Sequence, residues 1–123
     1  MAKIPINQIE GYENIAPSWW VDTDTGLLMS KRGAVKGSWS RSRKYPYTQV
    51  TLRTTDGKKI HKRLDRIIAI PCVDGRTAER NQVDHINGKH DDNRPCNLRW
   101  VSEQENKDFR TLRMLREGRQ GND

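Results

Sequence analysis

The sequence predicts a small α+β domain in which a basic β-hairpin and a short helix precede a second pair of strands and a second helix. Three observations predict this class. Polar and apolar side chains alternate around a turn signal at 47–63, apolar residues recur at helical spacing at 64–70, and a helix-capping sequence at 102–105 follows two short apolar segments. The 123 residues have room for one core of ordinary size, so we expect a single small domain with extensions.

The N-terminal arm comprises residues 1–26. It is slightly acidic, contains the adjacent residues Trp19 and Trp20, and has turn sequences at 16–18 and 24–26. These features predict either short strands or an irregular arm.

The basic hairpin and the first helix follow. Residues 47–53 (YTQVTLR) alternate in character and are rich in β-branched side chains, 54–57 (TTDG) is a turn signal, and 59–63 can return as the partner strand. The next segment, 64–70 (LDRIIAI), has the apolar spacing of a short amphipathic helix. We expect this helix to pack on the hairpin and to end before Pro71, because proline removes a helical hydrogen bond.

The second pair of strands is predicted at 83–86 and 98–101, joined by a long polar loop. Ser102 then fits a helix N-cap, and Glu105 completes a capping box, so a helix should begin near Glu103 and continue toward Gly118. The predicted organisation is an arm, a basic hairpin and helix, a core, and a helix end with a tail, at residues 1–26, 27–72, 73–110 and 111–123.

Positive charge is concentrated in one part of the chain. The formal net charge is +7, and residues 27–66 hold twelve lysines and arginines against two acids. These cations alternate with Trp39, Tyr45 and Tyr47, whose rings can stack on bases, so we favour a nucleic-acid surface over a merely solvated one. Arginines at every third position from 110 to 119 form a slanted helical stripe that suits either a phosphate backbone or a solvated surface. The DNA contacts we predict are Arg41, Arg43, Lys44, Arg53, Lys62, Arg63, Arg110 and Arg113.

Other classes of function are disfavoured. No apolar run approaches the roughly 18 to 20 residues that span a bilayer, so we expect no membrane partner. Cys72 and Cys96 stand alone without a CxxC pair, which argues against a structural zinc site, although spacing alone leaves a disulfide between them open. No secretory signal pattern occurs at the N-terminus, and we expect the protein in the cytoplasm, that of a host cell if it is phage-encoded.

Asp84 and His85 are the strongest candidates for chemistry. Hydrolysis of a phosphodiester needs an activated water and a cation at the phosphoryl oxygens. A histidine can act as general base, and Mg²⁺ is commonly held by only one or two protein oxygens. Adjacent side chains on a strand point to opposite faces, so both can serve one site only if the strand bends or ends there. The sequence Asn87-Gly88 just beyond makes such an end plausible.

Residues 83–106, VDHINGKHDDNRPCNLRWVSEQEN, resemble the nuclease core of HNH (ββα-metal) endonucleases, especially the phage and intron-associated homing type. The shared pattern is DHI(N/D)G, a variable loop, then NLRWV and SEN. Upstream, YTQVTLR and KIHKRLDRIIA are similar to the basic hairpin and helix of those enzymes, and IEGYENI is similar to their N-terminal DNA-binding motif. The resemblance implies a DNA endonuclease on double-stranded DNA that uses Mg²⁺ or Mn²⁺ and leaves 5′-phosphate and 3′-hydroxyl ends.

The resemblance also implies individual roles. Asp84 corresponds to the metal-binding acid and His85 to the general base. Asn97 corresponds to the middle residue of the motif, which braces the loop and orients the histidine, and Asn93 is its rival for that role. Asn106 stands where the family motif ends in His and would bind the metal from the helix.

Three further residues are predicted to lie outside the site, and the function has one alternative. We expect His90 to be a solvated loop residue, His61 to face solvent or phosphate, and Trp100 to pack in the core. The rival function is a DNA-binding or regulatory module that keeps the fold without cleaving. The sequence leaves open the oligomeric state, and whether one strand or both are cut.

Overall fold

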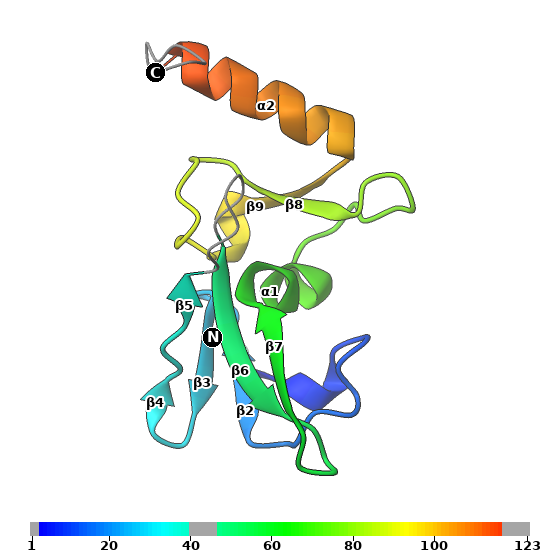
Figure 1. Cartoon of the computed structure of the whole chain (residues 1–123), viewed down its shortest axis with the longest axis vertical. Coiled ribbons are helices and arrows are strands. Elements are labelled where there is room, and N and C mark those ends of the chain that lie inside the picture. Colours follow the sequence, from blue (N-terminus) through cyan, green and yellow to red (C-terminus); the bar gives the residue numbers. More distant parts are fainter. Residues whose placement is uncertain (1–2, 40–46, 117–123) are drawn as a thin grey trace.

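The computed structural model describes residues 3–39 and 47–116, which form three antiparallel sheets and two α-helices (Figure 1). The N-terminal sheet and the hairpin sheet lie toward one end of the molecule, α2 lies at the other, and α1 lies between them. The α+β class predicted from the sequence is confirmed. Within the described ranges, no helix is long and apolar enough to cross a bilayer.

The N-terminal arm forms short strands, one of the two predicted outcomes. Its four-stranded sheet has the order β1-β2-β3-β4, so the arm and residues just beyond it share one sheet. The proposed boundary at 26 falls inside the β2–β3 turn, where the Gly26 amide donates to the Asp22 carbonyl at 2.9 Å. The elements are β1 (Lys3–Pro5), a 3-10 turn (Ile6–Gln8), β2 (Trp19–Asp22), β3 (Leu27–Ser30) and β4 (Gly33–Ala34).

The basic hairpin is confirmed as β6 (Thr48–Arg53) and β7 (Lys59–Arg63), with β5 (Ser38–Trp39) on the other edge of β6. Val50 and Leu52 are buried whereas the side chains between and beyond them, at 51 and 53, are exposed, because successive strand residues face opposite sides. The hairpin therefore has an apolar face toward the core and a polar, basic face outward.

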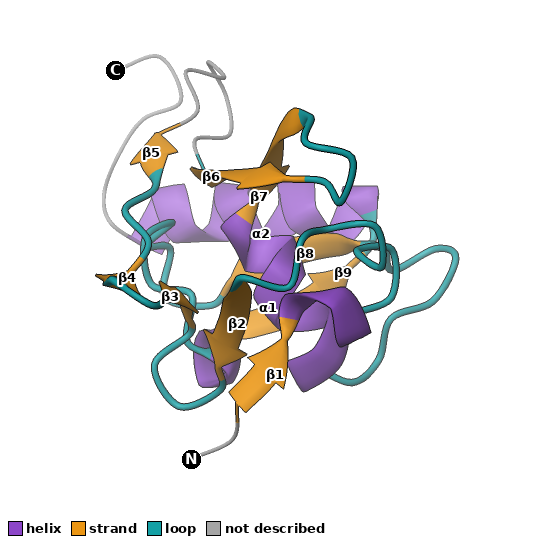
Figure 2. Cartoon of the chain, turned by 90° about the horizontal axis from the view of Figure 1, so that it is seen from below, coloured by secondary structure: helices purple, strands orange, loops and turns teal. Residues whose placement is uncertain are grey.

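Helix α1 (Leu64–Cys72) is two residues longer than predicted, and the expectation that it ends before Pro71 is wrong. Pro71 lies in the last turn, where its missing N–H costs one hydrogen bond but its φ still suits a helix. The helix closes when the Val73 amide donates to the Ala69 carbonyl at 2.9 Å. Figure 2 shows α1 near the centre of the molecule, and it contacts strands of all three sheets.

A single hydrophobic core joins the N-terminal sheet, the hairpin, α1 and the C-terminal strands. Ile67 and Ile68 of α1 are fully buried at its centre. Trp100 packs against the same cluster and donates from Nε1 to the Val73 carbonyl at 2.9 Å, which confirms its predicted core role. Cys72 and Cys96 are both free thiols.

The C-terminal half has the predicted order of strand, loop, strand and helix: β8 (Gln82–His85), a 3-10 turn (Pro95–Asn97), β9 (Leu98–Val101) and α2 (Glu103–Arg116). The capping box is present, because the Glu105 amide donates to Ser102 Oγ at 3.1 Å and the Ser102 amide donates to Glu105 Oε1 at 2.9 Å. Hydrogen bonds from Arg80 and from the Ser102 backbone lower the pKa of Glu105 to about 2.

Candidate active site

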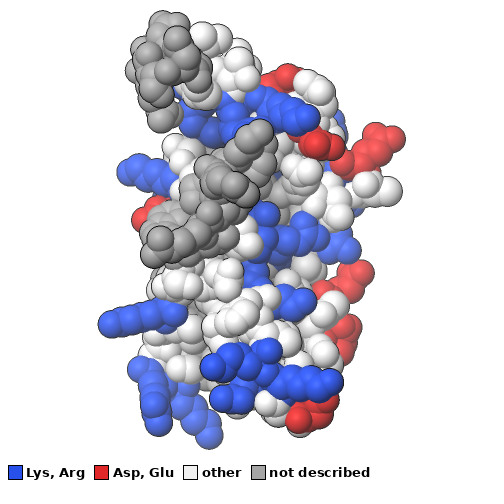
Figure 3. All heavy atoms as spheres, in the orientation of Figure 1, with Lys and Arg blue, Asp and Glu red and all other residues white. Residues whose placement is uncertain are grey.

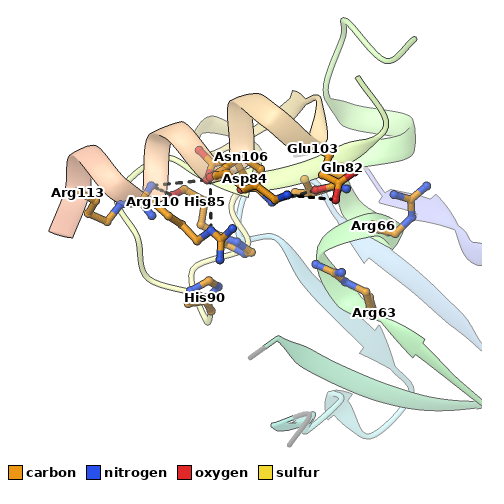
Figure 4. Close-up of a pocket in the computed structure, with 12 residues that line it drawn as sticks. Arg63, Arg66, Gln82, Asp84, His85, His90, Glu103, Asn106, Arg110 and Arg113 are labelled. Carbon is orange, nitrogen blue, oxygen red and sulfur yellow. Dashed lines mark hydrogen bonds and ion pairs between the residues drawn. The ribbon is translucent and has the colours of Figure 1, made fainter. Parts of the chain in front are cut away.

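A cleft of about 260 Å³ lies between β8 and α2 and extends toward the end of β7 and the start of α1 (Figure 4). It contains three of the four predicted site residues of the core motif. Its remaining wall is largely basic, and side chains from separate elements close it. The lining residues are Arg63, Arg66, Gln82, Val83, Asp84, His85, His90, Glu103, Asn106, Lys107, Arg110 and Arg113.

Asp84 and His85 both line this cleft although they are neighbours in the sequence. Strand β8 ends at His85, and a turn begins there, because the Gly88 amide donates to the His85 carbonyl at 2.8 Å. Each residue is only 4% exposed. The end of the strand therefore lets both side chains serve one site, as the Asn87-Gly88 sequence suggested.

The imidazole of His85 is held by Asn93. His85 Nε2 lies 2.8 Å from Asn93 Oδ1, and both side chains are buried. An amide oxygen only accepts, so Nε2 carries the proton in this contact and Nδ1 is the nitrogen with the basic lone pair. Asn93 thus selects the tautomer of His85.

Asn97 braces the loop that joins β8 and β9. Its Oδ1 accepts from the Asn87 amide at 2.9 Å, and its Nδ2 donates to Asn87 Oδ1 and to the Asp92 carbonyl, each at 2.9 Å. The hydrogen bond to the His85 ring comes from Asn93 instead. The two tasks that the resemblance assigned to one asparagine are therefore divided between the rivals, Asn97 for the loop and Asn93 for the ring.

Asp84 is a buried carboxylate with two arginine partners. Arg99 Nε donates to Oδ2 at 2.8 Å, and Arg113 Nη2 lies 3.6 Å from Oδ1. Arg99 was not predicted from the sequence, although antiparallel pairing of β8 and β9 places it directly opposite Asp84. That register is the signal that could have identified it.

Asn106 lies one turn into α2 and faces the same cleft as Asp84 (Figure 4). Its Nδ2 donates to Gln82 Oε1 at 3.0 Å, which engages the amide nitrogen and not the oxygen. The carboxylate of Asp84 and the amide oxygen of Asn106 are the donor types that Mg²⁺ prefers. In the part of the chain that the structure describes, no group of three or more His, Cys, Asp or Glu could hold a metal, so a cation here would keep water or substrate ligands.

His90 is closer to the site than expected. We predicted a solvated loop residue, but His90 is half-buried, lines the cleft, and its ring centroid lies 5.2 Å from that of His85. Burial lowers the pKa of His90, and the charges of His85 and Arg113 act in the same direction. His61 is exposed as predicted, and its Nδ1 lies 3.0 Å from Thr51 Oγ1.

The predicted DNA contacts lie in different surroundings. Arg53 and Lys62 are exposed on the hairpin, and Arg63 is held by the buried carboxylate of Asp65, with a nitrogen–oxygen distance of 2.7 Å. Arg110 and Arg113 point into the cleft. Arg41, Arg43 and Lys44 fall outside the described residues.

Three cations of the site were not among the individually predicted contacts: Arg66 and Lys107, which line the cleft, and Arg99, which contacts Asp84. Figure 3 shows lysine and arginine side chains spread over the face that carries the hairpin and α2, while most visible acidic side chains lie along one edge. The basic face therefore continues from the hairpin to the cleft.

Comparisons with known proteins agree with this site. Residues 74–108 match the family model described as HNH endonuclease. The chain is 33% identical over 107 residues to an uncharacterized HNH endonuclease of Acanthamoeba polyphaga mimivirus, an alignment that covers 85% of this chain and 24% of the relative. It is also similar to a solved structure of DNA binding and cleavage by the HNH homing endonuclease I-HmuI, with a TM-score of 0.70 and 27% identity over 92% of this chain and 59% of that one.

The resemblance to the HNH endonuclease family is thus confirmed, and residues 74–108 are the segment that matches the family model. It spans about a quarter of the length of the viral relative and somewhat over half of the solved homing endonuclease. The β8, loop, β9 and α2 unit described above contains residues 82–108 of the matched segment.

Proposed function

We propose that this chain is a metal-dependent DNA endonuclease that hydrolyses phosphodiester bonds with one divalent cation, Mg²⁺ or Mn²⁺, and with His85 as general base. The observation that carries the proposal is the convergence of His85, Asp84 and Asn106 on one cleft with basic walls. I-HmuI is described as binding and cleaving DNA, which supports DNA as the substrate. The homing type is proposed on that likeness alone.

His85 is suited to remove a proton from water. Its Nε2–H donates to Asn93, so Nδ1 can accept the proton as the water oxygen attacks phosphorus and the bond from phosphorus to the 3′ oxygen breaks. A cation between Asp84 and Asn106 would neutralise charge on the phosphoryl oxygens and on the departing oxygen. The products would carry 5′-phosphate and 3′-hydroxyl ends, as the family resemblance implies.

The basic face would provide most of the affinity for DNA. A two-stranded β-ribbon fits the major groove of duplex DNA, and the β6–β7 ribbon turns Arg53 and Lys59 outward as cross-strand partners. Cleft cations such as Arg66 and Lys107 would then meet the phosphates nearest the scissile bond. Contacts of this kind position a protein on DNA and make its binding strongly dependent on salt.

The test is cleavage of supercoiled plasmid with Mg²⁺ at saturating protein, comparing the wild type with His85→Ala. We expect the variant to bind DNA in a gel shift and to lose cleavage. His61→Ala is the matched control, because it removes an exposed histidine far from Asp84 in the sequence and should cleave normally once DNA is saturated. Equal cleavage by His85→Ala and the wild type would remove His85 as the base.

A second measurement separates the nuclease from its rival. If the wild type is inert with Mg²⁺ and Mn²⁺ but still shifts DNA, the non-cleaving binding module is the correct function. For the metal role, Asn106→Ala should raise the Mg²⁺ concentration needed for half-maximal cleavage while DNA affinity changes little. An unchanged Mg²⁺ titration would contradict the role of Asn106 as a ligand.

A further inference from the structure

Arg113 is held in one position beside the candidate catalytic residues. It lies seven residues after Asn106 on the same face of α2, and its side chain is only 18% exposed. Its Nη2 donates to the His85 carbonyl at 3.1 Å. The aliphatic part lies directly on Gly88, where a Cβ would come within 2.6 Å of Arg113 Cδ. A Cβ at position 88 would therefore force the Arg113 side chain to shift.

The same guanidinium distinguishes the two oxygens of Asp84. Oδ2 accepts a hydrogen bond of 2.8 Å from Arg99, whose guanidinium carbon also stacks 3.8 Å from the ring centroid of Phe109. Oδ1 lies 3.6 Å from Arg113 Nη2, which is a charge contact rather than a short hydrogen bond. Replacing the Arg113 contact at Oδ1 by another cation therefore costs less free energy than replacing the Arg99 hydrogen bond at Oδ2.

We propose that Arg113 is the counter-ion of Asp84 while the site is without metal, and that it competes with the divalent cation for Oδ1. A carboxylate as buried as Asp84 needs a positive partner, and Arg113 supplies part of that charge. A cation that binds Oδ1 meets the positive guanidinium nearby and is repelled by it. The inference rests on the proposed role of Asp84 as a metal ligand.

The predicted consequence is that Arg113 affects stability and metal affinity in opposite directions. Arg113 should stabilise the metal-free protein and weaken its binding of metal. The sequence placed Arg113 among the DNA-contacting arginines of α2, but its contacts with His85, Gly88 and Asp84 indicate a different use within the protein.

The test is titration of the full chain with Mn²⁺, followed by calorimetry or by the electron paramagnetic resonance of free Mn²⁺, for wild type and Arg113→Gln. We expect Arg113→Gln to bind Mn²⁺ about fivefold more tightly, because one nearby positive charge is removed. Arg116→Gln is the matched control, since it removes an exposed charge from the same helix and should change Mn²⁺ affinity less than about twofold. Thermal unfolding in EDTA should show a lower Tm for Arg113→Gln, and Mn²⁺ should raise that Tm more than it raises the wild-type value.

Each other outcome has a definite meaning. If Arg113→Gln binds Mn²⁺ no more tightly than wild type, the competition is refuted and the nuclease proposal stands. If Asp84→Asn binds Mn²⁺ like the wild type, the ion is not at Asp84, and both the competition and the proposed metal role fail. Should Arg113→Gln not fold, Arg113→Lys, whose shorter side chain weakens the charge contact, is expected to bind Mn²⁺ more tightly than wild type, and a wild-type affinity would overturn the proposal.

Discussion

Gly26 lies where the N-terminal sheet meets the loop between β8 and β9, and its replacement by alanine should impair cleavage from a distance. Gly26 has a φ of +67°, and a Cβ there would overlap the carbonyl oxygen of Asn93 and lie 2.6 Å from the Arg94 amide nitrogen. The atoms in the way belong to backbone, so either the turn or the loop has to move. Since Asn93 holds the His85 ring, a shift of the loop should disturb the proposed base.

The magnitude follows from two separate costs. A left-handed backbone costs an alanine roughly 1 kcal/mol whatever the space around it. The displaced loop also weakens the buried hydrogen bond between Asn93 and His85, and loss of such a bond costs about 1–3 kcal/mol. If that second cost falls on the transition state, cleavage slows by roughly 5- to 150-fold.

Gly33→Ala provides the matched control, because Gly33 begins β4 just after the next turn of the same sheet, has a φ of +107°, and would have nothing within 4 Å of an added Cβ. The assay is single-turnover plasmid cleavage well below the Tm, together with thermal unfolding. We expect Gly33→Ala to lose stability but cleave at the wild-type rate. Gly26→Ala should be less stable and should also cleave more slowly. Wild-type cleavage by folded Gly26→Ala would refute the coupling between the turn and the loop.

Three further predictions concern the loop, the helix cap and the DNA face. Asn93→Ala should slow single-turnover cleavage at least about tenfold, because the His85 ring loses its hydrogen-bond partner. Asn93→Asp keeps an acceptor for His85 and should recover part of the rate. An unchanged rate in Asn93→Ala would show that the His85 ring does not need this partner. Glu105→Gln should flatten the dependence of Tm on pH between about 4.5 and 2. The depressed pKa of Glu105 contributes stability that is present above pH 4.5 and is lost as pH falls toward 2. A wild-type slope of Tm against pH in the variant would contradict this. Lys62→Gln should lower the slope of log affinity for DNA against log salt by about 1, measured by fluorescence anisotropy, and an unchanged slope would remove Lys62 from the phosphate contacts.

The elements that the sequence predicted well are those set by local physics. The hairpin at β6 and β7, the capping box at Ser102 and the two strands around the polar loop follow from alternation, turn chemistry and capping within a few residues. Pro71 was misjudged because the loss of one hydrogen bond does not end the helix, and the Val73 amide still closes the last turn on the Ala69 carbonyl. The arm was left open between two forms, since strands of two to four residues carry too few side chains to establish a pattern.

The candidate site was predicted in its positions but not in its partners. The motif located Asp84, His85 and Asn106, whereas the contacts of Asp84 with Arg99 and Arg113 depend on strand register and on how α2 lies across the loop. Which asparagine contacts the His85 ring and which one braces the loop also depends on the folded loop. Asn93 and Asn97 are the same residue type four positions apart, so the sequence does not distinguish their roles. Such contacts arise from tertiary packing, which no local pattern contains.

These contacts explain how the polar loop between β8 and β9 can hold the His85 ring in one orientation. His85, Asn93 and Asn97 are each about 5% exposed or less, and within the described ranges no buried side-chain nitrogen or oxygen lacks a hydrogen-bond partner. Buried polar groups that are all satisfied stiffen a structure, while a single missing partner leaves a costly defect. The loop is also confined from outside, by the Gly26 turn on one side and by Arg113 on Gly88 on the other. Because the constraints come from three separate parts of the chain, a substitution far from the cleft can alter the orientation of His85 as effectively as one beside it.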